Sequence, residues 1–67
     1  MQTYIIKELQ NLQSDRQGKP YQSVSLAGAK QYATVNKAYY GTVLVIESKS
    51  GERLAYTGRR GNWINVF

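Results

Sequence analysis

The sequence contains no cysteine and no histidine. Without cysteine the chain has no disulfide and no thiolate metal site, and without histidine it lacks the commonest ligand for transition metals. The same absences remove the usual acid–base catalyst and all thiol chemistry, and nothing in the sequence marks a Ser–Lys dyad. We therefore predict a protein that is not an enzyme and that holds no metal or cofactor.

Acidic side chains are also scarce, since Asp and Glu together number 4 while Lys and Arg number 9. The close pair Glu47 and Glu52 flanks a predicted turn, and we interpret it as solvated charge rather than as the carboxylate pair of a glycosidase. The resulting net charge of +5 favours an acidic partner, either a protein or a nucleic acid.

Long apolar runs are absent as well. No segment approaches the roughly 20 apolar residues of a membrane span, and residues 1–9 do not show the basic leader and apolar stretch of a signal peptide. We therefore expect a cytoplasmic protein that makes no membrane contact. A length of 67 residues leaves room for one domain, residues 1–67, whose core is so small that homodimerisation is the remaining source of extra stability.

The first 24 residues show two strand-like segments separated by a polar stretch. Residues 2–9 contain the adjacent β-branched residues Ile5 and Ile6, which favour a strand, although a helix stays open as an alternative. Residues 10–20 are polar and include glycine and proline, so they are predicted to form a flexible loop. Residues 21–24 predict a short second strand.

A helix is predicted over residues 26–38, because this segment is rich in alanine and Ser25 precedes it as a suitable N-cap. Gly41 is expected to end this region. Apolar side chains at helical spacing indicate which side of the helix faces the core. They are Leu26, Ala29, Tyr32, Ala33 and Val35.

The remainder of the chain is typical of three consecutive strands. Residues 42–48 are apolar on both faces, as expected of a central strand, and strands at 53–57 and 63–67 follow turns at 49–52 and 58–62. The predicted fold is α+β, in the order β-β-α-β-β-β, with an antiparallel C-terminal meander and one helix packed on the sheet. If the last strand lies at a sheet edge, its unpaired backbone groups can pair with a strand of another chain, so we predict either strand addition by a partner or a homodimer.

The 58–62 turn reads Gly-Arg-Arg-Gly-Asn and is the most basic point of the chain. It matches the G-x-x-G loop of KH domains, but that loop joins two helices, whereas the flanks here predict strands, so we interpret it as a hairpin turn. Arginine forks suit phosphate, and aromatic rings beside cations suit bases. Trp63 is predicted to lie in the core. The predicted contact set for nucleic acid or a protein partner is Arg59, Arg60, Lys37, Tyr40 and Arg53.

The run from Ser25 to Phe67 carries the segments SLAGAK, GTVLVIES, G-x-x-LAY and G-x-W. In these segments it resembles short uncharacterised proteins encoded by phages and prophages. The resemblance implies an accessory role during infection or lysogeny, in which such proteins bind a host protein or nucleic acid. Our leading hypothesis is a non-enzymatic, small basic protein that binds another protein, expected to be acidic. The alternative is a nucleic-acid-binding module built around the 58–62 turn.

Overall fold

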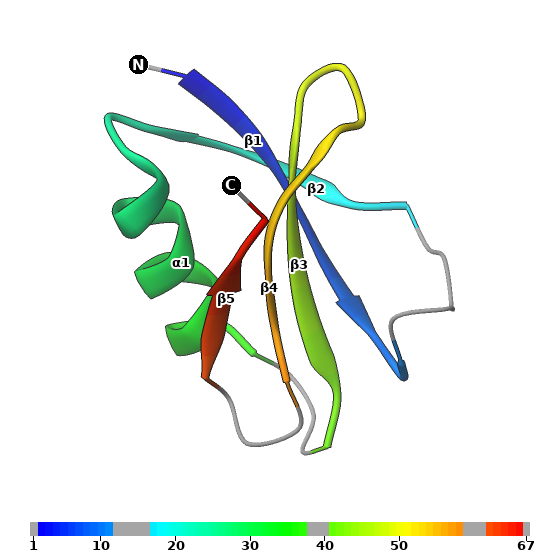
Figure 1. Ribbon diagram of the computed structural model, residues 1–67. Helices are drawn as coiled ribbons and strands as arrows, with labels where there is room; N and C mark the ends of the chain where they lie inside the picture. The colour runs from blue at the N-terminus through cyan, green and yellow to red at the C-terminus, as the bar shows by residue number, and fades with distance from the viewer. Residues whose placement is uncertain (1, 12–16, 38–40, 59–61, 67) are drawn as a thin grey trace.

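The chain folds into a five-stranded sheet with one helix against one of its faces (Figure 1). The computed structural model describes residues 2–11, 17–37, 41–58 and 62–66. In chain order the elements are β1 (Gln2–Leu9), β2 (Lys19–Ser23), α1 (Leu26–Val35), β3 (Val43–Ser48), β4 (Arg53–Thr57) and β5 (Trp63–Asn65). The predicted α+β class and the order β-β-α-β-β-β are confirmed, and the first segment is a strand rather than a helix.

The strands lie in the order β2-β1-β3-β4-β5, and every neighbouring pair is antiparallel. β3 is central, and its first four residues, Val43 to Ile46, are buried on both faces of the sheet. The central position expected for this segment is therefore confirmed, as is the meander formed by β3, β4 and β5. β1 pairs with the other side of β3, which leaves β2 and β5 as the two edges.

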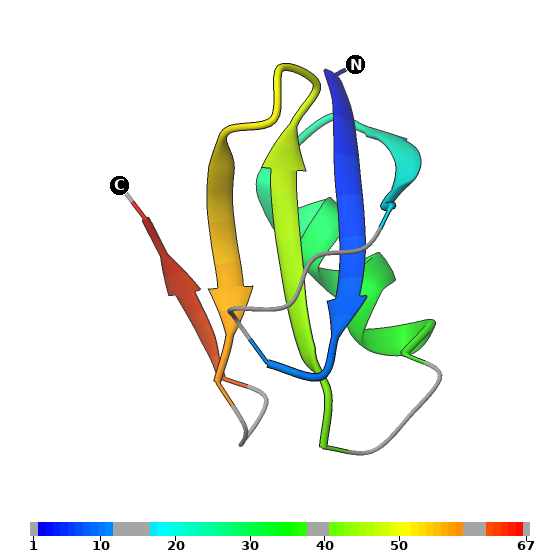
Figure 2. The same ribbon diagram turned by 90° about the vertical axis from the view of Figure 1, so that its right-hand side faces the viewer.

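Two apolar clusters lie on opposite faces of the sheet. On the helix side, Tyr4, Ala29 and Ile46 are buried, and Trp63 packs against them but is only half-buried, so its predicted place in the core is confirmed in part. On the other side, Leu9 and Val45 belong to a smaller cluster. Figure 2 views the sheet from this second face, with α1 behind it. Among the described residues, no helix combines the length and the apolar content needed to cross a membrane.

The first turn of α1 is closed by Ser25, whose Oγ accepts a hydrogen bond from the Gly28 amide at 3.2 Å. The predicted N-cap is thus confirmed. The helix is shorter than the predicted 26–38, because Asn36 caps its end by donating from both its backbone amide and its Nδ2 to the Tyr32 carbonyl. Gly41 has a φ of 76°, but it follows this cap by several residues and does not end the helix.

The core-facing side of α1 is narrower than the sequence indicated. Only Ala29 and Ala33 are buried in the helix, whereas Tyr32 is 41% exposed and Val35 is 75% exposed. The prediction that Tyr32 and Val35 face the core is wrong. Small alanine side chains let the helix backbone lie close to the curved sheet, so residues one step around the helix fall on its flank or outer side.

Two strand boundaries also differ from expectation. β2 begins at Lys19 rather than at residue 21, so the connection to it is shorter than the predicted loop over 10–20. Pro20 is tolerated within β2 because this strand lies at a sheet edge. The flexibility predicted for this loop falls largely on residues 12–16, which lie outside the described residues. β5 ends at Asn65, and beyond it the Val66 amide still donates to the Leu54 carbonyl at 3.0 Å.

Candidate functional site

The contact residues chosen from the sequence are only partly described. Arg59, Arg60 and Tyr40 lie outside the described residues. α1 ends near the end of the sheet at which β3 begins, and Lys37 follows α1 by two residues. Arg53 is the first residue of β4, next to the turn at the opposite end of the sheet (Figure 1). The structure therefore does not bring Lys37 and Arg53 together, and a patch centred on the arginines of the 58–62 turn stays a prediction.

The connection that carries these arginines does join two strands. β4 ends at Thr57 and β5 begins at Trp63, the two strands pair antiparallel, and the Gly58 amide donates to the Asn62 carbonyl at 3.2 Å. The interpretation as a hairpin connection rather than a KH-type loop between helices is confirmed.

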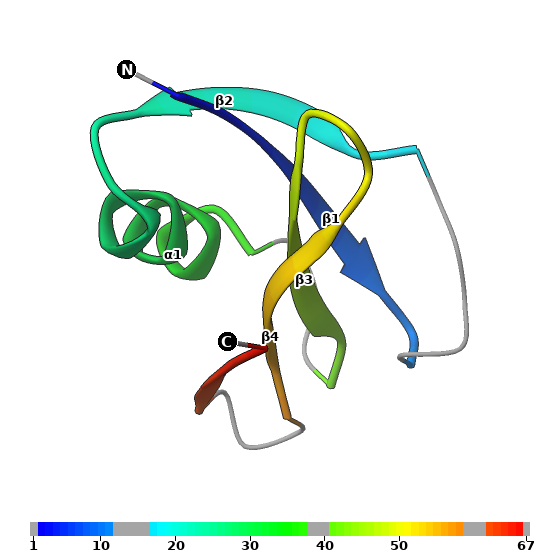
Figure 3. The same cartoon turned by 45° about the horizontal axis from the view of Figure 1, so that its top comes forward.

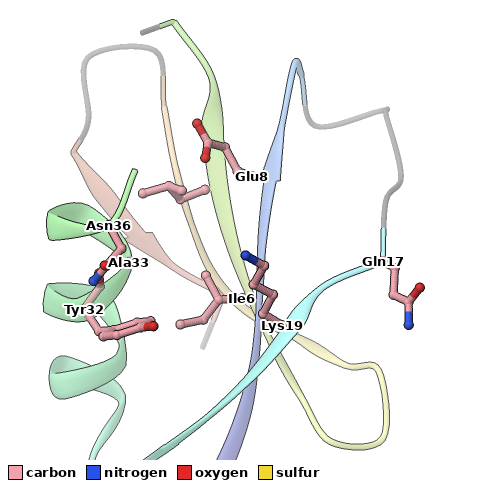
Figure 4. Close-up of a pocket in the computed structure, with 8 residues that line it drawn as sticks. Ile6, Glu8, Gln17, Lys19, Tyr32, Ala33 and Asn36 are labelled. Carbon is pink, nitrogen blue, oxygen red and sulfur yellow. The ribbon is translucent and has the colours of Figure 1, made fainter. Parts of the chain in front are cut away.

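A groove lies between α1 and the strands β1 and β2 (Figure 4). It is a hollow of about 340 Å³. Its floor is apolar and consists of Ile6, Ala33 and Leu44, whereas its polar wall is formed mainly by Glu8, Lys19, Tyr32 and Asn36. Figure 4 shows the Tyr32 ring reaching from α1 toward Ile6, with Lys19 and Glu8 on the strand side.

The polar groups of this groove are suited to hydrogen bonding with a side chain or a short segment of a partner. The Glu8 carboxylate accepts a hydrogen bond from the Thr42 hydroxyl at 2.7 Å, and Lys19 brings a cation from the edge strand β2. An apolar floor with a few polar groups on its wall is the usual composition of a site that receives a side chain or a short segment of a partner. Within the described residues, no group of three or more His, Cys, Asp or Glu lies close enough to hold a metal ion.

Next to the groove, α1 presents an exposed surface that carries no charge. We call it the outer surface of α1 and define it as Ala27, Gln31, Tyr32 and Val35. All four are exposed, with Tyr32 at 41% and Val35 at 75%. A second hollow, of about 320 Å³, opens here and is lined by Tyr21, Gly28, Gln31, Tyr32, Val35 and Asn36. Tyr32 therefore belongs to both hollows.

Contacts to both sheet edges hold α1 in place. On one flank, the rings of Tyr21 and Tyr32 stack with centroids 3.9 Å apart and planes inclined by 12°. On the other flank, Trp63 Nε1 donates to Thr34 Oγ1 at 3.1 Å, and Lys30 Nζ donates to Asn65 Oδ1. Figure 3 shows the sheet curving around α1, so that β2 and β5 can both reach it.

The charges differ between the two faces of the sheet. Around α1, the described residues include Lys19 on β2, Lys30 on the helix and Lys37 after it, together with one acid, Glu8 on β1. On the other side, Lys7 and Glu47 form an ion pair of 3.2 Å in which each side chain is 15% exposed. Arg53 lies opposite Glu47 in the pairing of β3 with β4, so this face also carries cations, but the larger group of described lysines lies around α1.

The sequence did not predict the groove or the outer surface of α1. Tyr21 and Tyr32 stack only because β2 pairs with β1 in a register that sets Tyr21 opposite Tyr4. The register of β1 against β2 joins residues that are far apart in the sequence, so it cannot be predicted from neighbouring residues. The signal that was present in the sequence is the absence of charge at positions 24, 27, 28, 31, 32 and 35, which recur at helical spacing.

Comparisons with known proteins were made for the whole chain. No family model matches it, and no match was found among curated proteins. A solved structure of AcrIF9, a small phage anti-CRISPR protein, is similar with a TM-score of 0.92 and 38% sequence identity, covering 100% of this chain and 90% of that one. The similarity supports the resemblance to small phage proteins and extends it beyond residues 25–67 to the first 24 residues.

Proposed function

Since this chain belongs to the AcrIF9 family, we propose that it is a phage anti-CRISPR protein that acts by binding a protein of the CRISPR machinery. The observation that carries the proposal is the 38% identity to AcrIF9 over the full chain, with a TM-score of 0.92. AcrIF9 is an anti-CRISPR protein that binds other proteins. The proposed place of action is the cytoplasm of the infected host.

The composition supports inhibition by binding rather than by catalysis. The chain has no histidine and no cysteine, and its open, partly apolar groove is suited to holding a partner's side chain. An inhibitor of this kind acts by occupying a surface, so its effect follows its dissociation constant and its molar ratio to the target. The net charge of +5 favours an acidic target surface.

The proposal is tested by titrating the purified chain against the purified CRISPR effector complex that AcrIF9 inhibits. We expect inhibition to increase in proportion to added chain and to stop increasing once the binding sites are filled. Inactivation of a large molar excess of effector would instead indicate catalysis. Absence of inhibition and of binding at saturating concentrations would refute the anti-CRISPR function.

The alternative from the sequence is a nucleic-acid-binding module. It is supported by the basic composition and by the hairpin connection that carries Arg59 and Arg60, with Lys37, Tyr40 and Arg53 as further proposed contacts. It requires binding of duplex or single-stranded DNA by the chain alone, with an affinity that falls steeply as salt rises. Failure of both probes to bind at about 50 mM salt would remove this alternative.

A homodimer through β5 is likewise a proposal, which sedimentation at several concentrations would test.

A further inference from the structure

We infer that the outer surface of α1 is the docking surface for the protein partner, and that the partner presents an apolar centre with acidic groups around it. This inference rests on the proposed anti-CRISPR function and assigns its contact to one face of the molecule. The proposed occupant of this surface is a protein, and direct contact of this surface with nucleic acid would overturn the inference.

The outer surface of α1 has an unusual composition for a helix that faces water. A helix that only faces water usually carries charged residues on its outer side. Here the residues of the outer surface of α1 carry no charge, and Tyr32 and Val35, which line the same hollow, are exposed by 41% and 75%. Exposed apolar side chains that gather on one face of a small protein mark an interaction site.

The outer surface of α1 is also held in place by contacts within the chain itself. Tyr32 stacks on Tyr21 at 3.9 Å, which fixes its side chain, and the Trp63–Thr34 hydrogen bond holds the opposite flank of the helix. Fixed aromatic side chains lose little conformational entropy on binding, and tyrosine is enriched among the residues that dominate the energy of interfaces.

The charges around the outer surface of α1 indicate the chemistry of the partner. Three lysines lie around the uncharged centre, with Lys19 on the β2 flank, Lys30 on the helix and Lys37 just after its C-terminal cap, so a partner with acidic groups at its rim fits best. A nucleic acid fits less well, because interfaces with nucleic acid place cations at their centre to contact phosphates. The centre of the outer surface of α1 holds none.

The test is a pair of identical substitutions on opposite faces. Gln31 lies on the outer surface of α1. Gln22 lies on β2 opposite Thr3, one residue from Tyr21, and therefore points to the other face of the sheet. Both side chains are exposed, and Gln31→Glu and Gln22→Glu each add one negative charge without changing side-chain size. Thermal unfolding of both variants checks that the fold is intact.

With the purified effector complex that AcrIF9 inhibits as the probe, we expect Gln31→Glu to weaken binding by about tenfold, the scale of a single hot-spot loss. The cause is an added carboxylate that faces acidic groups and is desolvated at the interface. Gln22→Glu is expected to bind like the wild type, and Gln31→Lys to bind better than Gln31→Glu.

A second variant addresses the apolar centre. Val35→Ser removes two methyl groups from a side chain that is 75% exposed, so it is expected to leave the fold intact while weakening binding by several fold. If Gln31→Glu and Val35→Ser both bind and inhibit as the wild type does, the docking surface lies elsewhere and the anti-CRISPR function still stands.

Two other results would also overturn the inference. If the wild-type chain neither binds nor inhibits the effector, the proposed function fails and the docking surface fails with it. If the chain alone binds a duplex DNA probe, and Gln31→Glu abolishes that binding with a steep dependence on salt, the outer surface of α1 contacts nucleic acid rather than protein.

Discussion

At the scale of single residues, Gly18 shows how one position constrains the path of the chain. It lies over β1 on the face opposite α1, where a Cβ would clash with Ile5 Cγ2 and would stand 2.9 Å from Lys7 Cγ and 3.0 Å from the Ile6 carbonyl oxygen. The carbonyl belongs to the backbone of a paired strand, so it cannot move away without disturbing the sheet. Glycine is therefore required here by space rather than by dihedral angle.

We expect Gly18→Ala to lower the free energy of unfolding by about 1–3 kcal/mol, the usual cost of forcing an extra methyl group into a packed site. In a domain of this size, each kcal/mol shifts the melting temperature by about 4–8 °C. Gly58→Ala is the matched control, because a Cβ at Gly58 would meet nothing within 4 Å. Equal melting temperatures for the two variants would show that the close approach at Gly18 is unimportant.

At this scale, the sequence predicted contacts between near neighbours in the chain, but not contacts between residues that are far apart in the sequence. Ser25 was identifiable as an N-cap because its hydroxyl meets the amide of Gly28, only three residues later in the chain. Tyr32 was wrongly placed in the core because its exposure depends on how α1 is rotated against the sheet. That rotation is set by Ala29 and Ala33 packing against strands that are distant in the sequence.

At the scale of elements, α1 and β5 depend on each other. β5 is only three residues long, and besides its pairing with β4 it is attached to the helix by the Trp63–Thr34 and Lys30–Asn65 hydrogen bonds. Thr34 also donates its hydroxyl to the Lys30 carbonyl at 2.9 Å. The short edge strand thus gains part of its stability from the helix.

Thr34→Val removes this hydroxyl and keeps the side-chain shape. We expect it to lower the free energy of unfolding by about 1 kcal/mol, because Trp63 Nε1 loses its acceptor. Thermal unfolding followed by the fluorescence of Trp63, the single tryptophan, measures the effect at β5 itself. Thr3→Val on β1 is the matched control, and if it costs as much as Thr34→Val, the contact between α1 and β5 contributes nothing.

The strands were the elements that the sequence predicted best. β1 and β4 were predicted with their observed bounds, and β3 was identified as central because both of its faces are apolar. The order of strands in the sheet was not predicted, since the pairing of β1 with β3 joins segments that are more than thirty residues apart. The groove between α1, β1 and β2 follows from that pairing, so it could not be located from local pattern alone.

At the scale of the whole molecule, the charge is unevenly distributed. Of the net charge of +5, the described residues place a surplus around α1, whereas Lys7 and Glu47 pair on the opposite face. The sequence predicted the total and therefore the preference for an acidic partner. It did not predict that three lysines gather around α1, because they come from β2, from α1 and from the segment after it.

This distribution predicts how binding to the effector depends on salt. A positive face accelerates encounter with an acidic surface over distances comparable to the Debye length, which is about 10 Å at 0.1 M salt. The contacts at the apolar centre are short-ranged, and salt screens them little. We therefore expect the association rate constant to fall by about tenfold or more between about 50 and 500 mM salt, while the dissociation rate constant changes much less.

Surface-based kinetic measurements at several salt concentrations separate the two rate constants. The effector complex should be treated with nuclease and repurified, so that contaminating nucleic acid cannot supply the negative charge. Lys19→Gln is expected to reduce the salt dependence of the association rate, whereas Lys49→Gln, in the turn between β3 and β4, removes the same charge at a distance from α1 and should reduce it less. If salt acts mainly on dissociation, or if the two variants behave alike, the positive face around α1 does not direct the encounter. In that case only the total charge of the chain matters.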